Sequence, residues 1–272
     1  MVKWQFLFEV DGIHLSQDKV SVSERIELER IDEYQSKAYV IIDVDQKETE
    51  IVIASYKPAW QLLEDFLSVY LVATGMSARI VRNLGGSQIP GTGGRGASVS
   101  PILTFPVRPI ISESDSVKMI EQAKKDFKIF SDAEESLKLA LRYFYQADET
   151  ERLQDKIILY FICLDALYSE ERTELSYRLS QRVALMLGQS QKERRQIFEN
   201  MRALYKKRGA VVHGSSISLS REEIGTLRDY AHSSVASFLQ LKKLGKNKKN
   251  ILDLLNVAWE SGRPIDELLK SE

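Results

Sequence analysis

The pattern of hydrophobic positions divides the chain into two parts. In the first, aromatic and β-branched residues gather between turn formers in the short segments 3–8, 38–42 and 50–53, which predicts strands. Apolar positions at helical spacing predict one helix over 59–74, and Gly75 stands where a C-terminal cap belongs. This part is therefore expected to be mostly β.

Two segments end the first part. Residues 85–96 are rich in glycine, but no Gly-Lys-Ser or Gly-Lys-Thr follows, so a flexible loop is favoured over a loop that cradles phosphate. Residues 101–109 alternate apolar residues with prolines, which is typical of a last strand or an extended linker. The domain boundary is expected near residue 115.

Beyond residue 115 the apolar positions recur at the three- and four-residue spacing of helices almost without interruption. Leu153, Ile157 and Phe161 lie on one apolar stripe, and stripes of this kind need a shared core. The predicted helices cover 117–130, 132–146, 151–169, 174–188, 191–208 and 221–243. This pattern predicts a helical bundle.

The sequence thus predicts an α+β protein in three parts. They are a β-rich N-terminal domain of unknown role (1–115), a helical bundle (116–245), and a basic linker with a short C-terminal helix (246–272). The basic stretch 242–249 is interpreted as a solvated linker, although the tail can also pack back or engage a partner.

Composition narrows the class of protein. Lys and Arg number 38 against 39 Asp and Glu, so no global field draws the chain to nucleic acid or membrane, and any such surface must be local. No stretch approaches the roughly 20 apolar residues of a membrane span, and the start lacks the apolar core of a signal peptide. The lone Cys163 follows an apolar run, which favours a buried thiol over a nucleophile. A soluble, cytoplasmic protein is expected.

Arg208 stands out because it continues an apolar stripe. It lies four residues after Leu204 and three after Tyr205, which directs its guanidinium toward the core side, whereas Lys206 and Lys207 turn toward solvent. An arginine buried without a partner is unfavourable. We therefore expect an anion beside it, either an acidic side chain or a bound phosphate.

His213 follows five residues later, after two valines and between glycines. An unbroken helix would set Arg208 and His213 about 140° apart, since each residue turns about 100°. The composition of 209–214 predicts that the helix ends or distorts after Arg208, which would let the two side chains converge. Histidine readily exchanges a proton near neutral pH. The alternative is a core histidine that caps a helix and donates to a carbonyl.

Three ordered segments around these residues give the chain a family resemblance. The Arg-x-x-x-x-His spacing of Arg208 and His213 resembles the signature of HEPN domains, and the wider frame is similar to the Apea-like HEPN group. The resemblance covers roughly residues 130–240. Its matching segments are 164–168, 177–188 and 204–214.

The resemblance implies a helical bundle that pairs into a homodimer and brings two Arg/His motifs into one cleft. Many members are metal-independent ribonucleases, in which the RNA 2′-hydroxyl attacks the adjacent phosphate and leaves a 2′,3′-cyclic phosphate. It implies that His213 is the general acid or base and that Arg208 holds the phosphate. Similar proteins often serve as toxins or antiviral effectors in prokaryotes. In that role the N-terminal domain would bind an unidentified trigger or regulatory partner.

Other residues have two interpretations each. Asp165 matches the family's acidic position and is expected to orient Arg208, or else to face solvent or a salt bridge. Arg178 and Arg182 are candidates for an RNA groove, with Lys206 and Lys207, or for pairing with acids such as Glu174.

Metal ligation and cofactors are not expected, since neither His14 nor His232 has partners at ligand spacing. Active family members commonly carry a polar residue where this chain has Gly209, which favours a rival hypothesis. That rival is a non-catalytic module that binds RNA, nucleotide or protein. A third hypothesis is a dimeric scaffold in which a carboxylate inside the protein meets Arg208.

Overall fold

The computed structural model is α+β, with a sheet in its N-terminal unit and helices in its C-terminal unit. The two compact units are Met1–Lys128 and Ile129–Glu272. The structure describes residues 2–13, 15–31, 35–44, 52–88, 113–170 and 175–269.

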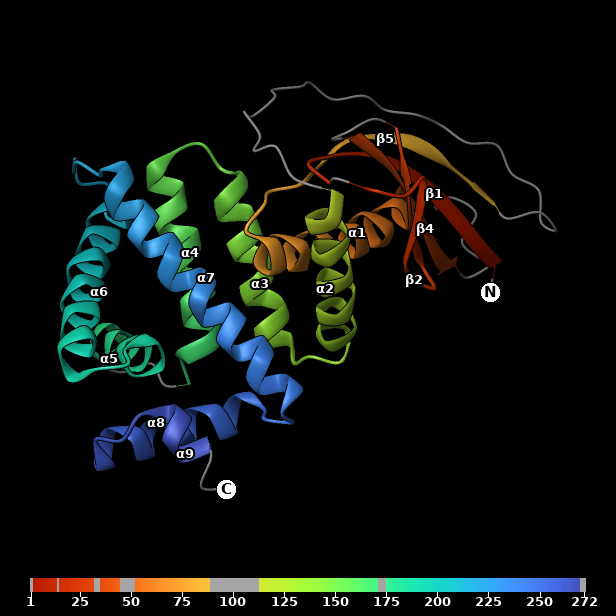
Figure 1. Ribbon diagram of the computed structural model, residues 1–272. Coiled ribbons are helices and arrows are strands. Elements are labelled where there is room, and N and C mark those ends of the chain that lie inside the picture. The colour runs from red at the N-terminus through yellow and green to blue at the C-terminus, as the bar shows by residue number, and fades with distance from the viewer. Residues whose placement is uncertain are drawn as a thin grey trace. The chain divides into compact units, whose positions relative to one another are not determined.

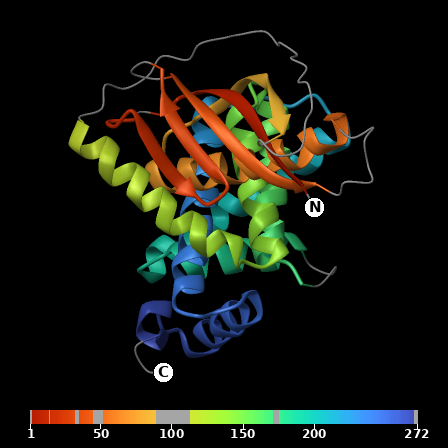
Figure 2. The ribbon, with the colours of Figure 1, turned by 90° about the vertical axis from the view of Figure 1, so that its right-hand side faces the viewer.

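The N-terminal unit is built on an antiparallel sheet in the order β2-β3-β4-β1-β5 (Figure 2). Its strands are β1 (Val2–Asp11), β2 (Lys19–Ser23), β3 (Ile26–Arg30), β4 (Gln35–Val44) and β5 (Arg79–Gln88). In β1 and β4 the predicted strands are confirmed. The interior strand β1 pairs with β4 along its whole length, from Val2 opposite Val44 to Asp11 opposite Gln35.

Helix α1 (Val52–Thr74) covers the sheet and contacts β4 and β5. Phe6, Phe8 and Val10 alternate along β1 and are buried, as the two-residue period of a strand requires. The ring of Phe8 meets Trp60 of α1 edge to face, with ring centroids 5.9 Å apart. The unit's core therefore lies between α1 and the sheet.

Some predictions for this unit were wrong. A strand was expected over 50–53, but α1 already begins at Val52 and contains Pro58. A short apolar run does not separate a strand from a buried helix by periodicity alone. Part of the glycine-rich segment belongs to β5, because Gly85 and Gly86 pair with β1. Its remainder from residue 89, the segment 101–109 and His14 lie outside the described residues.

Helix α2 (Glu113–Ser131) begins within the N-terminal unit. Its Phe127 meets Phe66 of α1 edge to face, with ring centroids 5.6 Å apart. The division between the units follows Lys128, whereas the sequence placed the boundary near residue 115. The change of periodicity marks where helices begin, and α2 is a helix that packs with the sheet unit.

The C-terminal unit is a helical bundle (Figure 1). Its helices are α3 (Glu135–Glu149), α4 (Leu153–Tyr168), α5 (Leu175–Leu187), α6 (Gln191–Val212), α7 (Arg221–Lys243), α8 (Lys248–Ser261) and α9 (Ile265–Leu269). Five of the six predicted helices are found here, and α7 has the predicted bounds, whereas the first predicted helix corresponds to α2. None of the described helices is long and apolar enough to cross a bilayer.

Helix α4 is central to the bundle, because it contacts α3, α5, α6 and α7. Its Phe161 meets Tyr205 of α6 and its Tyr168 meets Phe238 of α7, each pair edge to face with centroids 5.2 Å apart. Cys163 is fully buried in α4, and burial raises the pKa of its thiol. That environment suits an inert thiol.

The C-terminal tail packs on the bundle, because α8 contacts α5 and α7. Lys248, in the basic stretch 242–249, is the first residue of α8 and has a structural role. Lys248 Nζ donates to the carbonyl oxygens of Ala166 at 2.9 Å and Ser169 at 2.8 Å, at the end of α4. Burial lowers the pKa of Lys248. This lysine satisfies helix-terminal carbonyls that would otherwise lack donors.

Candidate functional site

Helix α6 carries both residues of the candidate pair. It begins with a capping box, in which the Ser190 hydroxyl accepts from the Glu193 backbone N–H and the Glu193 carboxylate accepts from the Ser190 backbone N–H. It ends at His213, where Gly214 adopts a φ of 73°. The Gly214 N–H donates to the Val211 carbonyl, and the next N–H donates back to Ala210 at 2.9 Å. This is a Schellman ending, which needs a left-handed residue.

The predicted break after Arg208 was wrong. Residues 209–212 stay helical, and the His213 N–H donates to the Gly209 carbonyl at 3.0 Å. Glycine and valine each disfavour a helix by only about 1 kcal/mol or less, which the rest of a long helix outweighs. Arg208 and His213 therefore lie about 140° apart around one helix. Within the described residues no hydrogen bond or ion pair joins them.

Arg208 is half-buried and has the acidic neighbour that the sequence led us to expect. Its guanidinium carbon lies 5.5 Å from the centroid of the Tyr205 ring. The positive charge of Arg208 acts on Asp165 of α4. The Arg208 Nε is buried and makes no hydrogen bond with any described residue. One donor of this guanidinium therefore has no acceptor within the described chain.

Asp165 lies in the last turn of α4 and is only partly exposed. Burial raises the pKa of its carboxyl, while the charge of Arg208 and a 3.3 Å hydrogen bond from the Ser169 hydroxyl act in the opposite direction. The balance of these effects disfavours the charged carboxylate. Asp165 thus lies close enough to Arg208 for the two side chains to interact through charge, and no direct hydrogen bond joins them within the described residues.

His213 is exposed at the end of α6, and within the described part of the chain its imidazole makes no hydrogen bond. Its neighbour Val212 is 51% exposed. One turn earlier, a Cβ built on Gly209 meets no atom within 4 Å. The end of α6 thus presents an ionisable group beside an apolar, unobstructed surface.

The other RNA-binding candidates divide into bound and available side chains. Lys207 forms an ion pair with Glu223 of α7 and donates to the Ser218 carbonyl at 3.3 Å, so it does not simply point to solvent as expected. The hydrogen bond that Lys207 donates to the Glu223 carboxylate lowers the pKa of Glu223. Lys206 is exposed.

The two arginines of α5 also differ. Arg182 is 8% exposed and donates to the Tyr168 carbonyl, so it joins α5 to the end of α4. Arg178 is half-buried and lines a cavity of about 330 Å³ that is formed by residues of α5 and α8. Glu174, one of its possible partners, lies outside the described residues.

Sequence analysis missed a pocket at the other end of α6. It has a volume of about 570 Å³ and is lined by residues of α5, α6 and α8 together with the segment that follows α8. Its lining includes three aromatic side chains and two arginines, among them Tyr177, Arg194, Phe198 and Trp259. One signal was present in the sequence, since Arg194, Phe198 and Arg202 follow one another at four-residue spacing and so share a helix face.

Comparisons with known protein families, curated proteins and solved structures find no match for this chain. Among the described residues, no group of three or more His, Cys, Asp or Glu side chains is placed to hold a metal ion.

Proposed function

We propose that the helical unit is a metal-independent endoribonuclease of the HEPN type that acts as a homodimer. The observation that carries the proposal is the end of α6. There an arginine beside Asp165 keeps a buried Nε without a hydrogen bond, and an exposed histidine follows five residues later. One residue suits the binding of an anion and the other suits proton transfer.

The chemistry follows from these two groups. The 2′-hydroxyl of RNA attacks the adjacent phosphorus, the bond to the 5′-oxygen of the next nucleotide breaks, and a 2′,3′-cyclic phosphate and a 5′-hydroxyl result. His213 takes the proton of the 2′-hydroxyl or supplies one to the leaving oxygen, and Arg208 stabilises the charge on the phosphate oxygens. DNA lacks the 2′-hydroxyl nucleophile and is not cleaved.

A second copy of the chain would allow an arginine and a histidine to meet, although Arg208 and His213 lie on different sides of α6. Arg208 and His213 diverge on one continuous helix, but two such helices facing each other place the arginine of one copy near the histidine of the other. The exposed Val212 and the open space at Gly209 provide an apolar surface for that approach.

The proposed biological role is that of a toxin or antiviral defence effector in the cytoplasm. RNA is its substrate, and the sheet unit senses a trigger or restrains the nuclease. These assignments extend the HEPN resemblance, which covers only the helical unit.

The test is incubation of the purified full chain with a mixed RNA pool in EDTA. We expect cleavage to 2′,3′-cyclic phosphate ends by the wild type, its loss in Arg208→Ala and His213→Ala, and its retention in Arg152→Ala, whose side chain is 77% exposed. Mixing the two inactive variants restores activity if one site takes Arg208 and His213 from different copies. Equal inertness of wild type and variants on every RNA would remove the nuclease proposal.

Gly209 favours a second candidate function, a non-catalytic module that binds RNA, nucleotide or a protein partner. Active relatives of the proposed family commonly carry a polar side chain at this position, and nothing in the described chain obstructs one here. In that case Arg208 anchors an anion and no RNA is cleaved. Tight RNA binding that is lost in Arg208→Ala but unchanged in His213→Ala, with no cleavage, would identify it.

A further inference from the structure

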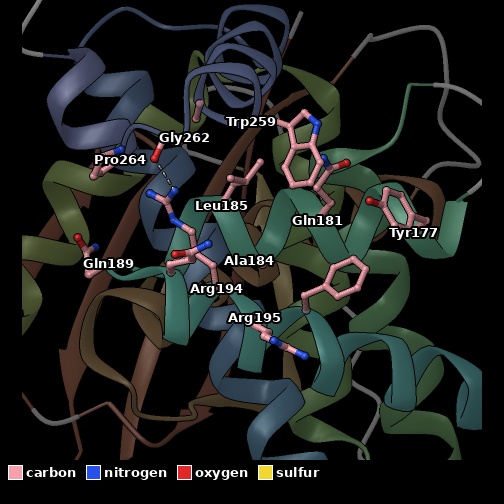
Figure 3. Close-up of a pocket in the computed structure, with 13 residues that line it drawn as sticks. Tyr177, Gln181, Ala184, Leu185, Gln189, Arg194, Arg195, Trp259, Gly262 and Pro264 are labelled. Atoms are coloured by element: carbon pink, nitrogen blue, oxygen red, sulfur yellow. Dashed lines mark hydrogen bonds between the residues drawn. The ribbon is translucent and has the colours of Figure 1, made fainter.

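The pocket at the N-terminal end of α6 has aromatic walls that the protein leaves uncovered (Figure 3). Tyr177 of α5 and Phe198 of α6 meet edge to face with ring centroids 5.4 Å apart. Trp259 of α8 lines the same pocket and is 57% exposed, and Tyr177 is 40% exposed. Large aromatic faces that remain open at a pocket are suited to stacking with a planar ring.

Arginines flank these rings. Arg194 lies in the pocket, where Nε donates to the Gly188 carbonyl at 3.0 Å and Nη1 donates to the Gly262 carbonyl at 3.4 Å (Figure 3). These contacts hold the side chain in place but leave its charge uncompensated, since no carboxylate of the described chain forms an ion pair with it. Arg195 also lines the pocket and has one surface partner, Glu199 at 3.0 Å.

Arg202 extends this arrangement one turn further along α6. Its guanidinium carbon lies 6.0 Å from the centroid of Tyr177 and 5.9 Å from that of Phe198. Within the described residues it also has no ion-pair partner. Arginine stacked on an aromatic ring keeps its in-plane N–H donors directed outward, where they can meet an anion.

A second cavity adjoins the first. It measures about 330 Å³ and shares Tyr177, Gln181 and Trp259 with the larger pocket. Across the described lining of both cavities there are four arginines and one glutamate, Glu260. This is a local excess of positive charge on a chain whose formal net charge is −1.

We propose that this pocket binds a nucleotide unit, with its base stacked on Trp259 and Tyr177 and its phosphate held by Arg194 and Arg195. A volume of about 570 Å³ lies in the range of small-molecule sites. Aromatic stacking tolerates any base, and the arginine fork matches phosphate oxygens. The unit is a free nucleotide or one residue of a single-stranded RNA. The site is separate from the Arg208 and His213 motif and does not depend on RNA cleavage.

The test is calorimetric titration of the full chain with adenosine monophosphate, adenosine, inorganic phosphate and a short single-stranded oligoribonucleotide. His213→Ala serves as the background, so that the oligonucleotide is not consumed. We expect saturable binding of the monophosphate or of the oligonucleotide, and weaker binding of adenosine and phosphate alone. Binding of the monophosphate identifies a free nucleotide as the ligand, and binding of the oligonucleotide alone identifies an RNA strand.

Substitutions inside and outside the pocket test whether the probes bind there. Trp259→Ala is expected to weaken it on the order of tenfold or more, because one stacking partner is lost. Leu244→Ala removes an apolar side chain that is 66% exposed outside the pocket and is expected to leave binding unchanged. Arg195→Ala is expected to weaken binding because it removes a proposed phosphate contact, and the similarly exposed Arg152→Ala is the control.

Three results would overturn the proposal. They are binding that survives Trp259→Ala, phosphate binding as tightly as the nucleotide, and no binding of any probe at millimolar concentration. Because the readout is binding in a cleavage-deficient background, an inert Arg208 and His213 motif would leave this result unaffected.

Discussion

The helical unit contains two groups made of arginine, aspartate and tyrosine, and they differ in how completely their hydrogen bonds are satisfied. In the first, Arg228 Nε donates to Asp148 Oδ1 at 2.5 Å, and the Tyr160 hydroxyl donates to the same oxygen at 3.3 Å. The Arg228 guanidinium also lies 5.9 Å from the centroid of the Phe144 ring. This group is closed, and it joins α3, α4 and α7.

In the second group, Arg208 lies over Tyr205 and acts on Asp165 through its charge alone. Its Nε is buried without a hydrogen bond within the described chain. The same residue types are therefore used in two ways. The first group has its donor and acceptors paired, whereas the second leaves one buried donor without an acceptor in the described chain.

The largest expected effect is on the rate of RNA cleavage, and it distinguishes Arg208 from Arg228. If the proposed nuclease is correct, Arg208→Ala lowers cleavage by about 10²–10³-fold, the range for loss of one group that stabilises charge in the transition state. Its free energy of unfolding changes by about 1 kcal/mol or less, because no direct hydrogen bond is lost. Arg228→Ala is expected to retain cleavage in the folded protein. Cleavage rates and urea unfolding of both variants measure this, and equal loss of activity in both would contradict it.

The next prediction concerns stability alone. Asp148→Asn weakens a partly buried ion pair that also receives the Tyr160 hydroxyl, so we expect a loss of about 2 kcal/mol in the free energy of unfolding. Asp155→Asn is the control, since its 3.8 Å pair with Arg152 lies on the surface and contributes little. Urea unfolding at neutral pH measures both. A loss no larger than that of the control would show that the group does not stabilise the fold.

Asp165 is expected to make the folded protein less stable as the pH rises, so its replacement by asparagine should stabilise the protein at neutral pH, whereas Asp148→Asn should destabilise it. Its pKa is raised above the ordinary value of 3.8, chiefly by burial, so the folded protein holds this proton more tightly than the unfolded chain does. The stabilising contribution is therefore complete below the unfolded pKa and is lost as pH rises from about 4 through the folded pKa. Asp165→Asn removes this loss.

The measurement is urea unfolding of wild type and Asp165→Asn at several pH values from acid to neutral. The stability of the variant relative to wild type should increase with pH across that range. A relative stability that falls with pH would mean that Arg208 stabilises the Asp165 carboxylate more than burial disfavours it.

The sequence predicted the helices of the bundle well because their ends are set locally. Helix α7 begins at a capping box formed by Ser220 and Glu223 and has the predicted bounds. Its apolar stripe has one period throughout, so local propensity and burial agree. The end of α6 was harder, because Gly209 and the valines after it disfavour a helix only weakly, and the left-handed Gly214 sets the end.

The Arg208 site and the pocket also differ in how far they could be predicted from the sequence. Arg208 was found from its place on an apolar stripe, and its acidic neighbour Asp165 was an expected one. The pocket was missed because Trp259 lines the same cavity as Tyr177 and Phe198 only after α8 packs on α5. Residues that lie about 60 and 80 positions away in the sequence have no local signal of this arrangement. In the sheet unit, β2 and β3 were missed because short strands depend on their neighbours, and β5 was missed because it contains glycines that are uncommon inside strands.

The smallest predicted effect is that of Gly209→Ala, which is compared here with Gly188→Ala in the same bundle. A Cβ at Gly188 would lie 2.6 Å from the Arg194 side chain and 2.8 Å from its backbone nitrogen, so Gly188→Ala is expected to destabilise the fold by about 1–3 kcal/mol. At Gly209 a Cβ meets open space within a regular helix. Gly209→Ala should therefore stabilise the free chain by about 0.5–1 kcal/mol, because alanine is the better helix former.

Gly209→Ala also tests the surface proposed for dimerisation. Thermal unfolding of the variant at low and high protein concentration separates the two effects. A gain at low concentration that shrinks or reverses at high concentration means that a second copy approaches the α6 backbone closely at this position. An equal gain at both concentrations means that the dimer interface does not include Gly209. Arg208 of one copy and His213 of the other would then have to meet without contact between the copies at Gly209. A loss at both would contradict the open environment of this glycine.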